Sequence, residues 1–166
     1  MFESLDLQIM HSHTEIKTFE NKNYEYIENI KLNYVKSLVL LIISEYEIII
    51  EKIFYLRAVA CDDYMLANFV KSQVDKKFRS PDLTKITSTL KKFDETLSEE
   101  FQRKITNTPI HTRWDNLMKA RHYIVHRSGN LNLTYEELLL SYDETKKVLY
   151  ELASILNVDM QNNKSI

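Results

Sequence analysis

The chain has 166 residues and a formal net charge of -2, and its length suits one domain with a single hydrophobic core. One glycine and two prolines leave almost no material for tight hairpin turns or glycine-lined phosphate loops. Cys61 is the sole cysteine, which excludes an intrachain disulfide and a cysteine-based zinc cluster. Helices joined by short connectors are therefore expected.

The first predicted helix covers about residues 3–20, where apolar side chains recur at loose helical spacing. The polar run at 20–23 ends it. The acidic start of this segment lacks the basic region and the apolar run of a signal peptide. We therefore expect a cytoplasmic protein.

The second and longest predicted helix extends from Tyr24 to about Ala60 without a glycine or a proline. Its most apolar part, residues 37–56, approaches the length of a membrane span. Four charges interrupt this part, namely Glu45, Glu47, Glu51 and Lys52. Such charges are costly in a bilayer but are tolerated along one edge of a bundle helix. The pattern predicts a core helix and no association with a membrane.

Helical patterning continues through the middle of the chain. Residues 62–63 supply an N-cap for a helix that we expect to reach about residue 78. The break at 79–82 restarts a helix with Pro81 in its first turn, and this helix is predicted to continue to about residue 105.

Two further helices complete the prediction. Thr108-Pro109 opens a helix that should end near 128–130, where Gly129 can adopt a left-handed cap without strain. The sequence at 134–137 matches a capping box, so the last helix is expected over about 135–157.

These elements predict an all-α protein, a single up-and-down bundle of four to six helices. One domain should cover residues 1–166, with its core at about 25–157 and a frayed tail at 158–166.

Basic residues are concentrated in the middle of the chain, at 71–92 and 103–127, whereas both ends are acidic. This distribution has two interpretations: a solvated helix surface, or a face that holds a nucleic-acid backbone. On the second interpretation, Arg113 and Lys119 are candidates for binding RNA.

Arg121 lies at the centre of an apolar face of the predicted helix that opens at Thr108-Pro109. On a helical wheel this face contains Trp114, Leu117, Met118, Ile124 and Val125. A guanidinium keeps its charge, so it needs a buried carboxylate or a polar surface as a partner. Glu45 shares the apolar face of the long helix, and we expect it to orient Arg121, whereas Glu47 and Glu51 should face solvent or the edge of the bundle.

His122 and His126 are four residues apart on the same helix and can interact. This spacing could bind zinc, but the metalloprotease pattern needs a glutamate after the first histidine, and Tyr123 occupies that position. We predict neither a metal nor a cofactor. A histidine that moves protons, beside an arginine that stabilises negative charge, suffices for RNA cleavage by its own 2′-hydroxyl.

The run Arg121-His122-Tyr123-Ile124-Val125-His126 resembles the signature of the HEPN superfamily, an Arg followed after four to six residues by a His. A polar residue commonly follows the Arg in that superfamily, and His122 takes this position. The continuation at 127–130 is similar to the turn found in several HEPN branches, among them the RiboL-PSP type.

The resemblance implies a bundle of four or five helices that dimerises, so that Arg and His of both subunits line one cleft. It also implies metal-independent RNA cleavage that leaves a 2′,3′-cyclic phosphate, often by toxins or in antiviral defence against phage. Arg121 and His126 are about 140° apart on an ideal helix, which favours a site shared between two subunits. Some toxin members carry a Tyr two residues after the His, where this chain has Ser128, so regulation through that Tyr is not expected.

Three hypotheses follow. The first is a homodimeric endoribonuclease in which His126 is the general acid or base and Arg121 binds the scissile phosphate, with His122 and Arg127 assisting. The second is a catalytically silent HEPN bundle that serves as a dimerisation or partner-binding module. The third is a plain helical partner of an operon-encoded protein, in which the motif is a coincidence. The candidate partners are RNA, a second copy of the chain, and an antitoxin or operon partner protein.

Overall fold

The computed structural model describes residues 1–22, 24–75, 77–126 and 131–160. These residues form seven helices and no strand, which confirms the all-α class. The helices are α1 (Glu3–Asn21), α2 (Ile27–Val59), α3 (Tyr64–Val74), α4 (Leu83–Phe93), α5 (Glu95–Ile105), α6 (Pro109–His126) and α7 (Tyr135–Ile155). Among the described residues, no helix is both long and apolar enough to cross a membrane.

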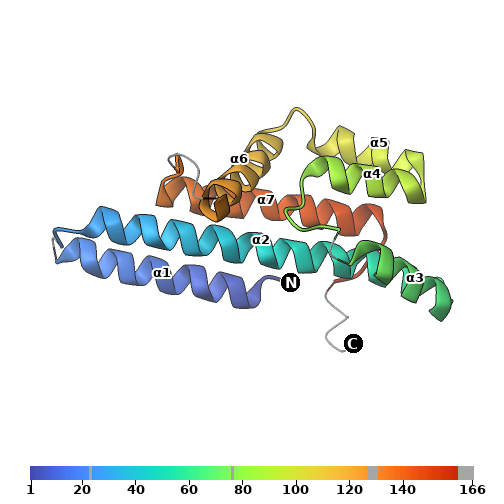
Figure 1. Cartoon of the computed structure of the whole chain (residues 1–166), viewed down its shortest axis with the longest axis horizontal. Helices are drawn as coiled ribbons and strands as arrows, with labels where there is room; N and C mark the ends of the chain where they lie inside the picture. Colours follow the sequence, from blue (N-terminus) through green and yellow to red (C-terminus); the bar gives the residue numbers. More distant parts are fainter. Residues whose placement is uncertain (23, 76, 127–130, 161–166) are drawn as a thin grey trace.

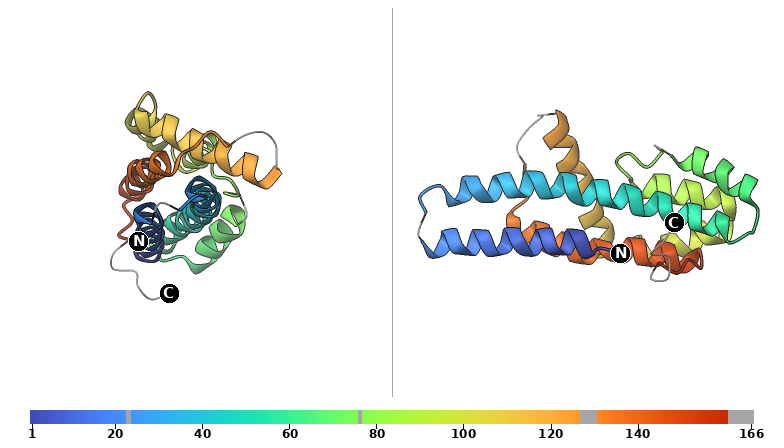
Figure 2. Two further views of the ribbon diagram at one scale, coloured as in Figure 1. Left: turned by 90° about the vertical axis from the view of Figure 1, so that its left-hand side faces the viewer. Right: turned by 90° about the horizontal axis from the view of Figure 1, so that it is seen from below.

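The long helix α2 organises the fold. It packs against α1, α3, α6 and α7, while α4 and α5 pack against each other and α5 also contacts α7. Figure 1 shows α1, α2 and α7 as a layer that runs along the length of the molecule. The helix α3 and the α4–α5 pair lie at one end of this layer. The helix α6 crosses this layer steeply, as both views of Figure 2 show. Its C-terminal end therefore points away from the layer.

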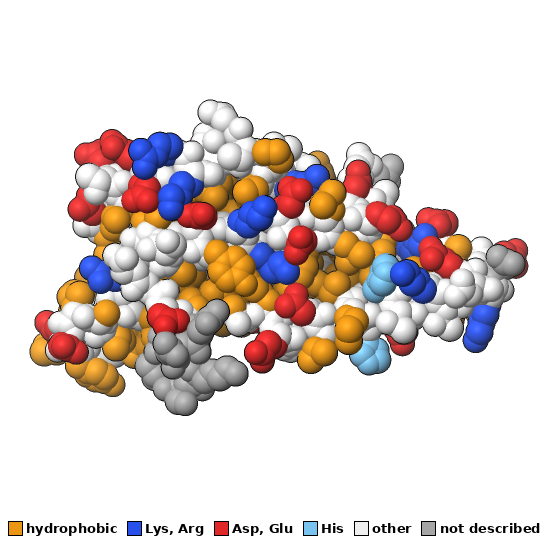
Figure 3. All heavy atoms as spheres, turned by 180° about the vertical axis from the view of Figure 1, so that it is seen from behind, with side chains coloured by type: hydrophobic (Ala, Val, Ile, Leu, Met, Phe, Trp, Pro, Cys, Tyr) orange, Lys and Arg blue, Asp and Glu red, His pale blue; other side chains and the backbone are white. Residues whose placement is uncertain are grey.

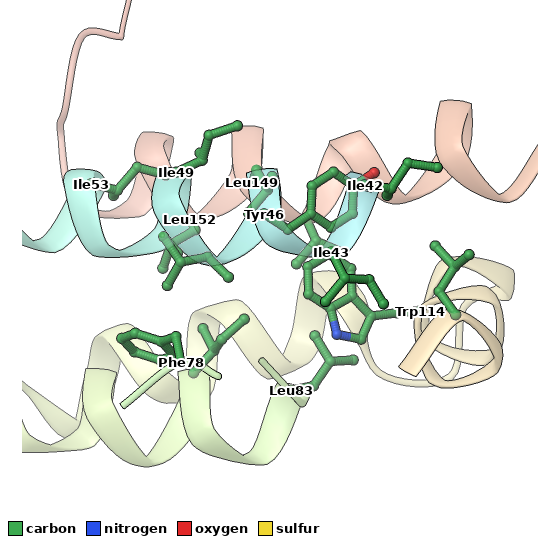
Figure 4. Close-up of a cluster of buried hydrophobic side chains, with 14 of the residues drawn as sticks. Ile42, Ile43, Tyr46, Ile49, Ile53, Phe78, Leu83, Trp114, Leu149 and Leu152 are labelled. Atoms are coloured by element: carbon green, nitrogen blue, oxygen red, sulfur yellow. The ribbon is translucent and has the colours of Figure 1, made fainter. Parts of the chain in front are cut away.

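The centre of the core is aromatic. Tyr46 of α2 stacks on Trp114 of α6 with ring centroids 5.1 Å apart, and both side chains are fully buried (Figure 4). The Tyr46 hydroxyl shares a 2.8 Å hydrogen bond with Thr145 of α7, which satisfies its polar atom. Burial raises the pKa of Tyr46, so this hydroxyl stays neutral. The contact joins α2, α6 and α7 at one point.

The helix count is larger than the four to six that the sequence predicted. Asp94 ends α4, and its side chain then accepts a 2.8 Å hydrogen bond from the Thr96 backbone N–H to begin α5. The predicted continuous segment up to residue 105 is therefore two helices. A single aspartate that caps the following helix is a weak signal when no glycine or proline accompanies it.

Several predicted helix starts are confirmed. Asp63 caps α3, Pro109 is the first residue of α6, and Thr134 and Glu137 form a complete capping box at the start of α7. Pro81 is a small correction: it precedes the N-cap Asp82 instead of lying in the first turn of α4. The expected Gly129 cap and most of the expected tail lie outside the described residues.

Candidate functional site

The first half of α6 is anchored in the core. The Trp114 indole Nε1 donates a 2.8 Å hydrogen bond to the Pro81 carbonyl, and Leu117 is fully buried one turn later. On the flank, Arg113 Nε donates a 2.6 Å hydrogen bond to Glu144 Oε2 of α7. These contacts to α7 and to the segment before α4 set the direction of the whole helix.

Arg121 lies where this anchored half ends. Its Nη1 donates a 2.5 Å hydrogen bond to the Ser80 hydroxyl, and its Nη2 is 3.6 Å from Glu47 Oε1 of α2. The Arg121 side chain keeps 26% of its surface exposed. A guanidinium has five N–H donors, and the described residues accept one hydrogen bond from it. Arg121 is thus oriented by the fold with donors left for a ligand.

The partner of Arg121 differs from the one expected on the sequence. The prediction chose Glu45, but the ion pair is formed by Glu47. Glu47 follows Ile43 by four residues and precedes Ile50 by three, so it shares a helix face with two fully buried side chains.

The prediction failed because the middle of α2 is buried on more than one side. The prediction placed Glu45 on a single apolar face of the helix, and Ile48, three residues after Glu45, lies on the same side. Ile48 is exposed in the structure, and Glu45 is half-buried on that same side of the helix. When a helix has neighbours on several sides, its apolar residues do not define a single buried face. A helical wheel therefore cannot tell which carboxylate faces the core.

Ser80 is a site residue that the sequence reasoning missed. Its φ of 52° lies in the left-handed region, which is uncommon for a residue other than glycine. Its backbone N–H donates a 2.7 Å hydrogen bond to Glu47 Oε1, and its carbonyl accepts one of 2.9 Å from Lys85 Nζ. Glu47 therefore binds both Ser80 and Arg121. The break at 79–82 was visible in the sequence, but its packing against Arg121 was not.

The two histidines of the motif lie at the free end of α6. The ring centroids of His122 and His126 are 4.5 Å apart with a 45° angle between the planes, and both residues are exposed. His126 is five residues beyond Arg121, about 7.5 Å along the helix axis. Both imidazoles can therefore reach a ligand that approaches this end of the helix.

The apolar face predicted for α6 stops before the helix does. Trp114 and Leu117 are buried as expected, but Val125 is 50% exposed and the neighbouring Tyr123 is 41% exposed. The physical reason is the steep crossing of α6, which carries its last turns beyond the helices that bury its first turns (Figure 2). An apolar surface remains beside the histidines.

The remaining predicted site residues have different surroundings. Lys119 is exposed, whereas Arg113 is engaged by Glu144. Arg127 lies outside the described residues. Within the described ranges, no three His, Cys, Asp or Glu side chains gather as metal ligands would.

The arrangement combines two chemical capabilities. A fixed guanidinium can bind a phosphate and stabilise negative charge that develops on it, because its planar donors match phosphate oxygens. Two exposed imidazoles can accept and donate protons. Together they supply what an internal displacement at phosphorus needs.

Comparison with known families supports the assignment suggested by the motif. The family model described as RiboL-PSP-HEPN matches residues 7–158, which is most of the chain. Neither the curated proteins nor the solved structures contain a match. The matched range includes all of α2 to α7, and the chain belongs to the RiboL-PSP-HEPN family.

Proposed function

We propose that this protein is a metal-independent endoribonuclease that acts on cytoplasmic RNA as a homodimer. The observation that carries the proposal is the end of α6, where the exposed pair of His122 and His126 follows the oriented Arg121. Membership of the RiboL-PSP-HEPN family supports it. Arg121 and His126 are the proposed catalytic residues.

The proposed reaction is an internal transesterification. His126, acting as general base, removes the proton from a ribose 2′-hydroxyl. The 2′-oxygen then forms a bond to phosphorus while the bond from phosphorus to the 5′-oxygen breaks. A second imidazole, from His122 or from the other subunit, donates a proton to the leaving 5′-oxygen. The products are a 2′,3′-cyclic phosphate and a free 5′-hydroxyl.

Arg121 stabilises the extra negative charge on the phosphoryl oxygens during this displacement. Its contacts with Glu47 and Ser80 hold the guanidinium in place before RNA arrives, which lowers the cost of ordering it. In this proposal Glu47 replaces Glu45 as the supporting carboxylate. His122 and Arg127 assist.

Other basic residues of α6 are proposed to contact flanking phosphates. Lys119 is exposed for this purpose. Arg113 has the same proposed role, but Glu144 competes with RNA for its guanidinium, so we expect Arg113 to contribute less than Lys119.

A homodimer would complete the site. Arg121 and His126 point in different directions around α6, so residues from two copies can meet on one phosphate more readily than residues from one. The exposed side chains of Tyr123 and Val125 offer apolar surface beside the motif for such a contact.

The decisive experiment is cleavage of total cellular RNA in EDTA by the wild type and by Arg121→Ala, Arg121→Lys and His126→Ala. We expect cleavage by the wild type and a loss of about a hundredfold or more in the two alanine variants. Mass spectrometry of the fragments should find 2′,3′-cyclic phosphate ends. Thermal unfolding and sedimentation should show folded dimers in all samples.

Two control variants remove the same types of side chain at positions away from the proposed site. His111→Ala removes an imidazole from the opposite end of α6, and Arg103→Ala removes an exposed guanidinium from α5. Both should retain full cleavage. No cleavage of any RNA by a folded wild-type dimer, or cleavage that survives Arg121→Ala and His126→Ala, contradicts the proposal.

A catalytically silent module for dimerisation or partner binding is the second candidate. The engagement of Arg121 by Glu47 and Ser80 favours it, because an arginine used only to join α2, α6 and the 79–82 break would have these contacts. This candidate predicts that the protein cleaves no RNA. It also predicts a dimer, or a complex with an antitoxin-like partner, whose formation His126→Ala does not change. Under the first candidate, such a partner would control a toxin or antiviral nuclease.

A further inference from the structure

A groove lies between the C-terminal end of α2, the helix α3 and the end of α4, at the opposite end of α2 from its contact with α1. It has a volume of about 580 Å³. This volume lies within the range of ligand pockets, about 300–1,000 Å³. None of the residues assigned to the proposed nuclease site lines it.

The groove has an apolar lining that the fold leaves uncovered. Leu66 and Phe69 of α3 are 42% and 60% exposed, and Phe93 at the end of α4 is also exposed. Tyr64 and Met65, at the start of α3, are more exposed still. Figure 3 shows hydrophobic side chains gathered over the end of the molecule where α3 lies. A contiguous exposed apolar surface of this kind marks an interaction site.

The charged residues that line the groove are all basic. The groove is lined by Arg57 of α2, by Lys77 in the segment between α3 and α4, and by Lys92 of α4. Among its described lining residues there is no aspartate or glutamate. Within the described part of the chain no carboxylate forms an ion pair with these three cations. Partial burial, and secondarily the positive charge of Lys92, lower the pKa of Lys77. An anion in the groove would relieve this repulsion.

A second hollow on the other side of α3 provides a contrast. It is lined by Lys52 and Lys71 together with Glu51 and Asp75, so its charges can balance within the chain. The described residues that line the α2–α3–α4 groove include no such carboxylate. A ligand with negative charge would balance the three cations that line it.

We propose that the α2–α3–α4 groove binds an amphipathic helix of a partner protein, with apolar side chains on one face and carboxylates on its flanks. The hollow shape favours a partner that inserts side chains, because the apolar walls can surround them on several sides. The walls are helices, whose ridges and grooves accept the ridges of a third helix. Leu66, Phe69 and Phe93 contact the apolar face, and the three cations pair with the carboxylates.

The test uses a synthetic helical peptide of about 16 residues with leucines at i, i+3, i+4 and i+7 spacing and glutamates on the flanks. A second peptide carries lysines in place of the glutamates. Fluorescence anisotropy with the full chain should show binding of the acidic peptide, weakened about tenfold or more for the basic one. Added salt should weaken the binding of the acidic peptide.

Two pairs of variants locate the site. Leu66→Asp should abolish binding. Leu140→Asp should leave binding unchanged, because Leu140 is a leucine of α7, 46% exposed, that does not line the groove. Lys92→Glu should weaken binding of the acidic peptide, whereas Lys147→Glu, on α7, should not. All four positions are exposed, so folding should survive, as thermal unfolding will verify.

Three outcomes overturn the proposal. One is equal binding of both peptides, or no binding of the acidic one by the folded chain. Another is binding that Leu66→Asp does not change. The third is association with vesicles of phosphatidylserine and phosphatidylcholine that Leu66→Asp abolishes while the acidic peptide does not bind, which would identify a membrane surface. RNA cleavage should be unchanged in Leu66→Asp. A negative result for peptide binding would therefore not contradict the proposed nuclease, and a negative result for RNA cleavage would not contradict the proposed peptide site.

Discussion

The two halves of α6 belong to one helix but have opposite surroundings. Trp114 and Leu117 in the first half are fully buried, and Arg113 is tied to α7. In the second half His122, Tyr123, Val125 and His126 are exposed. Arg121 lies between them, bound on one side by Glu47 and Ser80 and open on the other.

This difference shows how a small helical protein can hold polar side chains in fixed positions at its surface. The buried half fixes the direction of the helix, so the exposed half is held in position without being covered. Proposed catalytic groups on a rigid helix are placed more accurately than groups on a loop. Substitutions in the first half should therefore change stability, and substitutions in the second half should change function.

The largest expected effect comes from removing the anchor of the first half. Trp114→Ala should lower the free energy of unfolding by about 3–5 kcal/mol, because it leaves a cavity against Tyr46 and an unpaired Pro81 carbonyl. Urea unfolding followed by circular dichroism measures this loss. Tyr123→Ala is the matched control in the second half and should cost less than about 1 kcal/mol. Similar losses for both variants would remove the distinction between the two halves.

An intermediate effect is expected at the boundary between the halves. Glu47→Gln weakens the ion pair with Arg121 and should cost about 1–3 kcal/mol. It should also reduce RNA cleavage, because Arg121 loses part of its support.

Glu45→Gln is the matched control for that change, two residues away on the same helix. Urea unfolding and cleavage assays of the two variants, run side by side, distinguish the two carboxylates. A larger loss in Glu45→Gln than in Glu47→Gln would restore the pairing first expected on the sequence.

The smallest expected effect on stability is at Val125. Because this side chain is half exposed, Val125→Asp should change the free energy of unfolding by about 0.5 kcal/mol or less. We expect it to weaken self-association, since it places a charge in the proposed dimer contact. Analytical ultracentrifugation over a range of concentrations measures the effect. A variant that dimerises as tightly as the wild type would place the dimer contact elsewhere.

Local signals were sufficient for many elements of the fold. Pro109, the Thr134 capping box and the Asp63 cap act within a turn of where they occur, so the starts of α6, α7 and α3 were predictable. The separation of α4 from α5 was missed, because Asp94 acts as a cap without an accompanying glycine or proline.

What the sequence by itself determined is the all-α class, the position of the Arg121 to His126 run on one helix, and the family to which that run points. Periodicity and caps are local, so they can be read from neighbouring residues. Only the tertiary structure decided that Glu47 instead of Glu45 meets Arg121, and that Ser80 joins them from a distant break. It also decided that α6 leaves the core before its last turns. These outcomes depend on how helices cross and on which sides of α2 are covered, and no single helix encodes that packing.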